Sequence, residues 1–561
     1  MMNTSTKHKD SPCGRSRRWY LIIILFLSSI STGISQYHHP LENITAETPA
    51  YRIFNHLLQT SGALPLAEPG YLTYTDLEEA FLQWKLDHPK PEAEEEKLCT
   101  RLEEIFSDVL ELDMNPGRSF TPTLEVGIGI DYLHRQPIHH TGQDSVFYTL
   151  FKDRDFVRHY DDRGNLIDVR IKSSYWHYLY FDSQFALRES WQDINSVSHH
   201  FPRDFHDIEN NFNRETIFLF RIPPILIVSG RDRLSMGPGR HGNLLVSNSL
   251  PPLDIFRFSV NFGDYFKFYD FIAPMNNIFT DLLDETVPPK YLLGHRLAFQ
   301  PKPNLRISVS ELMVINSQLQ WSYLNPLNIF HNMSNSVSKN ILSGLDIEYQ
   351  IKSDLYSYLS LVIDEIDFYL IEPEGEAPLT DSESRFVYGV QLGLDGYSSR
   401  VEDQPLWSIE WVKLNKWLYN YAYQTQGKDL TYTYIDRQDF PEQDAFYRFI
   451  GHYLGSNAEA LYLDFNQNNW GLFYQYIDQG EVLILQPSFS EDYPLPHEYK
   501  QILGAKYHLN GLHRNWSMDF GLNHTWNIHS GYDPLTTVNR FEFWIEGRFT
   551  ILTLKDIFFS S

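Results

Sequence analysis

The chain has 561 residues and carries 46 Lys and Arg against 72 Asp and Glu, a formal net charge of −26. A chain this acidic repels the phosphate backbone, so nucleic-acid binding is not predicted. Aromatic residues make up 15% of the chain, and past residue 35 no uninterrupted apolar run reaches the roughly 18 residues that a membrane-spanning helix needs.

Residues 1–35 are predicted to be a signal peptide. Several basic residues precede the apolar run "WYLIIILFLSSI" (19–30), and small residues follow it before a cleavage position near Gln36. This run is too short to span a bilayer as a helix. Removal of the signal peptide, residues 1–35, takes away five basic residues and one acidic residue. The remaining chain has 41 Lys and Arg against 71 Asp and Glu, a net charge of −30. An exported, aromatic-rich chain is then either a soluble all-β protein or an outer-membrane barrel.

Residues 46–114 are predicted to form a small α-helical domain in the periplasm. Thr48-Pro49 is typical of a helix start, and Thr75 with Glu78 predicts a capping box at the start of a second helix. A third helix is predicted where Leu98, Leu102, Ile105 and Phe106 keep helical spacing.

From residue 123 to 561 the apolar period changes from helical to alternating. Apolar residues alternate with polar or small ones in the segments 124–132, 345–352, 385–395, 516–526 and 541–551. This pattern predicts strands with one apolar and one polar face. In 385–395, for example, Tyr388 and Val390 are expected to face lipid, whereas Gln391 is expected to face the lumen, where a substitution should cost little.

The lengths of the connections between these strands favour a membrane barrel. Short links such as 301–304 and 467–469 alternate with long ones such as 365–384 and 414–458. A soluble β-sandwich has little reason to sort its loops in this way, whereas a bacterial outer-membrane barrel does. The predicted fold is therefore an all-β transmembrane antiparallel β-barrel of about 18 strands. The strand count is least certain in 145–175 and 405–458.

The stretch "GPGRHG" (237–242) matches the G-x-G-x-x-G pattern of dinucleotide-binding loops. That pattern must open a helix, but Pro238 interrupts it and two prolines end the segment that follows. Nucleotide binding is therefore not predicted. We interpret Gly237, Gly239 and Gly242 as structural residues that let backbone segments pack closely.

Arginines near this stretch are the candidate binding residues. Arg231, Arg233 and Arg240 flank the glycines, and alternation places Arg257 and Arg296 in the lumen nearby. Guanidinium groups could bind the carboxylate or sulfate of an acidic sugar. The alternative is that they pair with lumenal Asp and Glu and stiffen the barrel. Trp321 could stack on a sugar ring.

No catalytic residue, metal site or cofactor is predicted. The chain has no nucleophile motif, and its histidine pairs and acidic clusters lack the spacing of metal ligands. The protein is therefore not expected to be an enzyme.

Four stretches carry a resemblance to a known family: "GRDRLSMGPGRHGNLLVSNSLPP" (230–252), "YLLGHRLAFQPKPNLRISVSE" (291–311), "LNPLNIF" (324–330) and "LLQTSGALPLAEPGYLTYTDLEEAF" (57–81). Together they resemble the capsule assembly protein Wzi family of outer-membrane barrels. The resemblance implies a non-catalytic role in attaching or assembling a surface polysaccharide at the outer membrane of a diderm bacterium, in contact with membrane lipid. Divalent cations could bridge the acidic chain to the glycan. A passive diffusion channel remains the alternative function.

Overall fold

The computed structural model describes most of the chain between residues 38 and 555. Within that range it leaves out 43, 45–47, 67–71, 108, 110–119, 136–164, 176–177, 190–207, 210–214, 249, 264, 276–288, 326–327, 331–338, 367–385, 399–403, 417, 420–433, 441–442, 481–495, 511–515 and 531–533. The predicted signal peptide, residues 1–35, lies outside the described residues.

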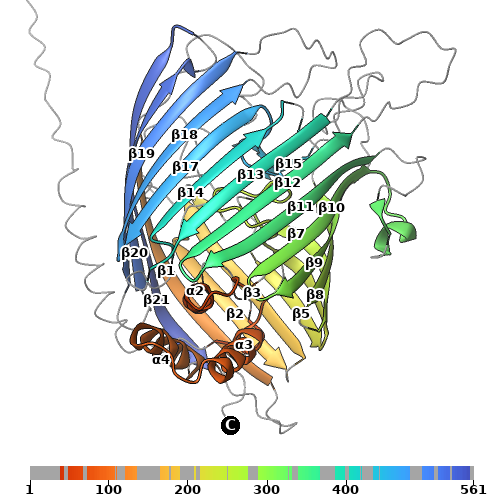
Figure 1. Cartoon of the computed structure of the whole chain (residues 1–561), viewed down its shortest axis with the longest axis vertical. Coiled ribbons are helices and arrows are strands. Elements are labelled where there is room, and N and C mark those ends of the chain that lie inside the picture. Colours follow the sequence, from red (N-terminus) through yellow and green to blue (C-terminus); the bar gives the residue numbers. More distant parts are fainter. Residues whose placement is uncertain are drawn as a thin grey trace, which may run out of the picture.

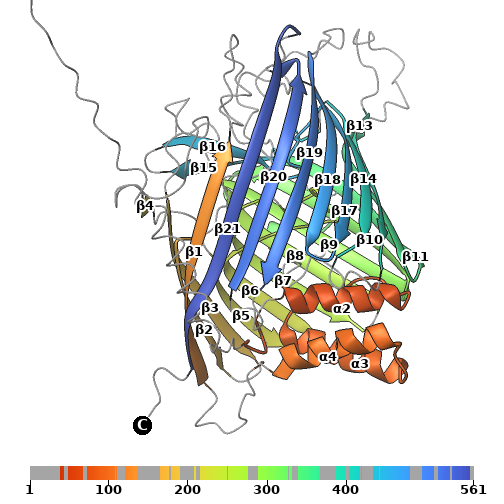
Figure 2. The same ribbon diagram turned by 90° about the vertical axis from the view of Figure 1, so that its left-hand side faces the viewer.

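In the part of the chain that the structure describes, three helices precede the barrel: α2 (Pro49–Thr60), α3 (Tyr74–Asp87) and α4 (Ala93–Ser107). Their shared apolar core includes Phe54, Phe81 and Leu102. They lie together at one end of the barrel, the lower end in Figure 2. Among the described residues, no helix has the length and hydropathy required to cross a membrane.

The predicted capping box of α3 is wrong by two residues. Thr73, not Thr75, is the N-cap: its hydroxyl accepts the N–H of Asp76 at 3.1 Å, and Asp76 accepts the N–H of Thr73 at 2.9 Å. The Thr75 hydroxyl donates instead to the carbonyl of Pro40 at 3.0 Å. A contact with a segment 35 residues away thus decides which threonine caps the helix.

The barrel is closed and antiparallel, as predicted, and eighteen of the described strands form its wall (Figure 1). They are β1 (Phe120–Arg135), β2 (Ile167–Tyr175), β3 (Leu179–Glu189), β5 (Thr216–Ile222), β6 (Ile225–Asp232), β7 (Leu253–Phe262), β8 (Phe266–Met275), β9 (Lys290–Lys302), β10 (Leu305–Asn316), β11 (Lys339–Lys352), β12 (Leu355–Ile366), β13 (Phe386–Gly396), β14 (Trp407–Leu414), β17 (Ala458–Gln467), β18 (Trp470–Gly480), β19 (His497–Asn510), β20 (Trp516–Ile528) and β21 (Thr537–Lys555).

Pairing between the first and last strands closes the wall, with Ile128 opposite Phe549. The short β4 (Ile208–Glu209) pairs only with the end of β3 among the described strands. Two further strands, β15 (Ile435–Phe440) and β16 (Gln443–Phe449), form a separate hairpin within the uncertain stretch 405–458.

The alternation predicted for the wall strands is confirmed. On β11, Asp346, Glu348 and Gln350 are buried in the interior, whereas Tyr349 and Ile351 are exposed on the outside. Large aromatic side chains are exposed on the outer face at the end where the turns are short: Tyr175, Tyr178, Phe262, Tyr265 and Trp470. Such a ring of aromatics is typical of the membrane interface of an outer-membrane barrel.

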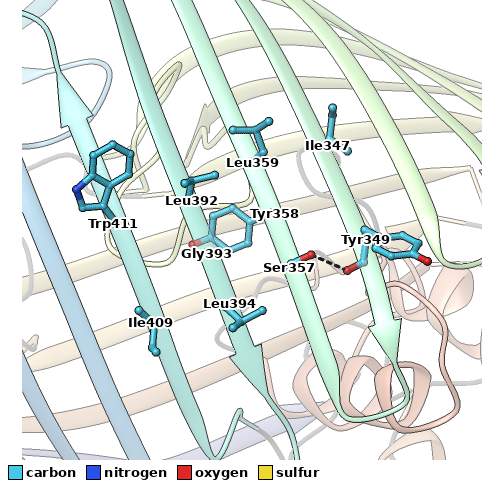
Figure 3. Close-up of a pocket in the computed structure, with 10 residues that line it drawn as sticks. All are labelled: Ile347, Tyr349, Ser357, Tyr358, Leu359, Leu392, Gly393, Leu394, Ile409 and Trp411. Atoms are coloured by element: carbon cyan, nitrogen blue, oxygen red, sulfur yellow. Dashed lines mark hydrogen bonds between the residues drawn. The ribbon is translucent and has the colours of Figure 1, made fainter.

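The outer wall has a shallow depression of about 380 Å³ across β11–β14 (Figure 3). Its lining is mostly apolar and includes Ile347, Leu392 and Trp411. Gly393 leaves room on the lumenal side, where an added Cβ would lie 2.0 Å from the ring of Tyr358. Because the depression is apolar and continuous with the outer face of the wall, it is not a candidate for a polar ligand.

Candidate functional site

The connection between β6 and β7 turns into the barrel. This inward loop, residues 233–252, leaves the long-loop end and reaches the opposite wall near the short turns. There, Arg240 Nε donates to Asp395 of β13 at 2.8 Å, and Arg240 Nη2 donates to Tyr397 at 2.8 Å. His241 Nε2 lies 2.7 Å from a carboxylate oxygen of Asp464 on β17. The loop that carries the three glycines therefore lies inside the lumen.

The backbone of the inward loop at Gly237, Gly239 and Gly242 favours glycine. Gly237 and Gly242 have φ values of +138° and +141°, which favour glycine. At Gly239, an added Cβ would lie 2.1 Å from the carbonyl oxygen of Gly242. The loop can therefore fold back on itself at its tip only with glycine at these positions.

Glu410 of β14 fixes the tip of the inward loop. Its carboxylate accepts the backbone N–H of Arg240 at 2.8 Å and that of His241 at 3.3 Å, and it also accepts the hydroxyl of Tyr358. Sequence reasoning missed Glu410, Asp395, Asp464 and Tyr397. Their lumenal position follows from the alternation, but their partners lie about 155 to 223 residues away in the chain.

Two histidines near the loop tip, the partly exposed His241 and the fully buried His452, differ in their electrostatics. Burial opposes a charge on His241, but the hydrogen bond with Asp464 and the negative charges of Asp464 and Glu410 together outweigh burial and raise the pKa of His241. Burial, and then the charge of His241, lower the pKa of His452 to about 3. His241 is therefore the more readily protonated of the two, while His452 stays neutral at neutral pH.

The half of the lumen nearer the long loops is filled with apolar side chains. Leu234, Met236, Leu244, Leu245 and Val246 of the inward loop pack against wall residues and against the segment 418–454. Tyr419 donates to the carbonyl of Leu244 at 2.6 Å, and Tyr434 donates to that of Asn340 at 2.8 Å. Gln391 faces this packed interior, is fully buried and donates to Gly242. A substitution of Gln391 is therefore expected to be costly, contrary to the expectation from the sequence, because it would remove this hydrogen bond from a packed interior.

The helical segment closes the other end. The backbone N–H of Leu64 donates to Pro303 in the β9–β10 turn at 2.9 Å, and Arg306 donates to the carbonyl of Pro65 at 2.9 Å. The side chain of Leu64 packs with Tyr397, and the ring of His56 lies 5.7 Å from that of Tyr397. Tyr397 thus contacts the helical segment on one side and Arg240 of the inward loop on the other.

The predicted arginines are not gathered in one cluster. Arg257 and Arg296 do face the lumen, where Arg257 pairs with Asp232 at 2.9 Å and Arg296 pairs with Asp346. Arg231 lies on the outer side of β6 and pairs with Asp254 at 2.7 Å, whereas Arg233 lies 3.4 Å from Glu215.

Each predicted arginine, Arg240 included, therefore has a carboxylate partner. This agrees with the alternative that the arginines pair with Asp and Glu and stiffen the barrel. The role of these arginines in binding stays a prediction. Trp321 begins a short 3₁₀ helix, η4 (Trp321–Leu324), beyond the end of β10.

The closed wall, its apolar outer face and its aromatic ring define an integral β-barrel of the bacterial outer membrane. Residues 225–364 match the family model described as capsule assembly protein Wzi. The resemblance to the Wzi family is therefore confirmed for that segment, which contains the inward loop and strands β6–β12.

Similar solved structures are also barrels of the outer membrane. The carbohydrate-binding β-barrel Wzi of Escherichia coli, involved in group 1 capsule assembly, has a TM-score of 0.49 at 11% identity, over 90% of this chain and 98% of that one. The outer-membrane protein OprD of Pseudomonas aeruginosa has a TM-score of 0.39 at 12% identity, over 78% and 96% of the two chains. No curated protein sequence matches the chain.

Proposed function

We propose that the protein attaches or assembles a surface polysaccharide at the outer membrane and catalyses no reaction. The observation that carries this proposal is the match of residues 225–364 to the capsule assembly family. That segment includes the inward loop, whose contacts organise the interior of the barrel. The carboxylates at the loop tip are already bound by arginine, histidine or tyrosine, which gives no support to a role in acid–base catalysis.

The polysaccharide contact that we propose lies at the long-loop end. Arg231 and Arg233 remain 34% and 48% exposed in their pairs with Asp254 and Glu215. An exposed pair is weakly held, so each guanidinium can exchange its carboxylate for that of an acidic sugar, or for a sulfate. In this proposal Arg240, Arg257 and Arg296 act indirectly, by holding the wall and the inward loop in place. Divalent cations offset the repulsion between the acidic chain and an acidic glycan.

A passive diffusion channel is the competing function. The apolar core inside the lumen and the helical segment at the short-turn end both argue against it, because a diffusing solute needs a continuous polar path. Filling by side chains from distant segments therefore favours the attachment role.

The test is polysaccharide retention on cells that carry Arg231→Ala together with Arg233→Ala. We expect retention to fall while heat-modifiable gel mobility shows a folded barrel. Lys413→Ala is the matched control, because Lys413 is also about half exposed and pairs with Glu459 at 3.4 Å on the outer side of the wall. Retention equal to that of the control would contradict the proposed contact.

A further inference from the structure

Part of the connection between β10 and β11 lies on the outside of the barrel. We name residues 317–325 and 328–330 the strap. Tyr323 and Phe330 of the strap are buried against Leu293, Met313 and Ile315. In Figure 1 the strap is the short green ribbon beside the wall at β10.

Alternation along β9 and β10 shows that the wall residues Leu293, Met313 and Ile315 face the membrane side. On β9, Arg296 points inward to Asp346, so Leu293, His295 and Leu297 point outward. On β10, Leu312 and Val314 belong to the lumenal core, so Met313 and Ile315 point outward. The strap therefore covers a part of the wall that would otherwise face lipid.

Polar groups clasp the strap to the wall. His295 Nε2 and Glu311 Oε2, on the outer face, are 3.1 Å apart, and Glu311 also accepts the backbone N–H of Phe330 at 2.8 Å. Lys339 of β11 donates to the carbonyl of Phe330 at 2.8 Å. The rings of His295 and Phe330 have centroids 4.4 Å apart.

These contacts explain how an ionisable pair can lie on a membrane wall. Charged side chains on the lipid face of a barrel destabilise it by up to a few kcal/mol, depending on depth. His295 and Glu311 are each only 15% exposed, because the strap lies over them. The strap thus covers the polar side chains of His295 and Glu311, and its own outer surface faces the membrane in their place.

That outer surface is amphipathic. Ile329 is 55% exposed and Leu319 is 36% exposed, whereas the exposed side chains of Ser322 and Asn325 are polar. Below the strap the wall continues as exposed apolar surface, at Val309 and Leu297. An element with exposed apolar and polar side chains beside a lipid-facing wall fits the boundary between headgroups and acyl chains.

We propose that the strap lies in the membrane interface on the long-loop side and contacts lipid acyl chains through Leu319 and Ile329. Its partner is a lipid surface, and this role goes beyond the attachment of polysaccharide. The strap gives the barrel a lipid contact outside its wall, above β9 and β10.

The experiment places an environment-sensitive nitrobenzoxadiazole label at single cysteines. In a background with Cys13→Ser and Cys99→Ser, the label is attached at Leu319→Cys, Ile329→Cys or Ser322→Cys. The protein is reconstituted in phosphatidylcholine vesicles with and without lipids that carry a doxyl quencher on the acyl chain. All three positions are on the strap, and Ser322 is the matched polar control.

We expect labels at positions 319 and 329 to lose most of their emission to the acyl-chain quencher, and the label at 322 to keep most of its emission. Equal emission at 322 and 329, whether both are quenched or neither is, would overturn the proposal. A second variant tests the apolar contact of the Phe330 ring with the wall: with Phe330→Ala added, the difference between 322 and 329 should shrink. An unchanged difference would show that this ring does not hold the strap.

Discussion

The residue that best shows how the interior is held is Arg240. Its guanidinium is about one-third exposed, but its partner Asp395 is almost completely buried on β13. An arginine in this position does more than add one ion pair, because it keeps a buried carboxylate from being left without a counter-charge. The same side chain also donates to Tyr397, which contacts the helical segment. Arg240 therefore links the inward loop to the helical segment through Tyr397.

Replacing Arg240 with Met should therefore destabilise the barrel. Breaking a buried pair by removing one partner costs on the order of 3 kcal/mol, since the remaining charge loses its compensation. The measurement is denaturant unfolding of the refolded protein in detergent micelles. The double variant Arg240→Met with Asp395→Asn should recover part of the loss, because it removes the stranded charge. A single variant as stable as the wild type would contradict this account of Asp395.

At the scale of elements, the strands could be predicted and the loops could not. A wall strand shows its two faces in its own sequence, as at Asp346, Ile347 and Glu348, because lipid and lumen act on successive residues. The path of the inward loop depends on contacts such as His241 with Asp464, 223 residues apart. The sequence of the inward loop itself contains no signal for its path into the lumen. Its glycines indicate only that backbone segments pack closely.

One signal for a filled lumen was present in the sequence. At Phe386-Val387-Tyr388 the apolar residues are consecutive, which indicates burial on both faces of the strand. The structure places Val387 in the lumenal core. An interior that held only water would favour a polar residue at that position.

The N-terminal segment before α2 offers a prediction on pH. The ring of His39 is buried at the short-turn end of the lumen, with Nδ1 2.8 Å from the Ser174 hydroxyl and Nε2 2.9 Å from that of Thr123. Burial lowers the pKa of His39 to about 4, although nearby Glu42 acts in the opposite direction. The docked state therefore holds neutral His39, whereas the undocked state takes up a proton near pH 6.5.

Because the docked pKa is the lower one, stability is lost as the pH falls from about 6.5 towards 4. Between pH 7 and pH 5 the segment should lose about 2 kcal/mol of docking free energy. Hydrogen exchange of residues 38–42 at the two pH values measures this loss. Glu42 adds little in this window, since its pKa is lowered in the docked state and its ordinary value of 4.5 already lies below pH 5. His39→Gln should flatten the dependence, and an undiminished dependence in this variant would assign it to another group.

At the scale of the whole molecule, the wall and its contents form one packed body. Apolar side chains fill the half nearer the long loops, and the helical segment with its polar contacts closes the other end. The wild-type protein should accordingly show little single-channel conductance in planar lipid bilayers. Replacing residues 234–250 with a short Gly-Ser linker should raise the conductance, because it removes most of the loop that crosses the lumen. Steady large openings of the wild-type protein would instead support the channel function.

The packed interior has a consequence for the chain before it reaches the membrane. Strands β12, β13 and β14 carry apolar residues inside the barrel, at Val362, Val387 and Val412, and outside it, at Leu361, Val390 and Trp411. An unfolded chain on its way to the outer membrane therefore carries short stretches, such as Phe386-Val387-Tyr388, in which successive residues are apolar and which favour aggregation. It should depend on periplasmic chaperones more strongly than a porin whose lumen is lined with charges. Depletion of such a chaperone should then reduce the amount of this barrel in the membrane before it reduces that of an open porin.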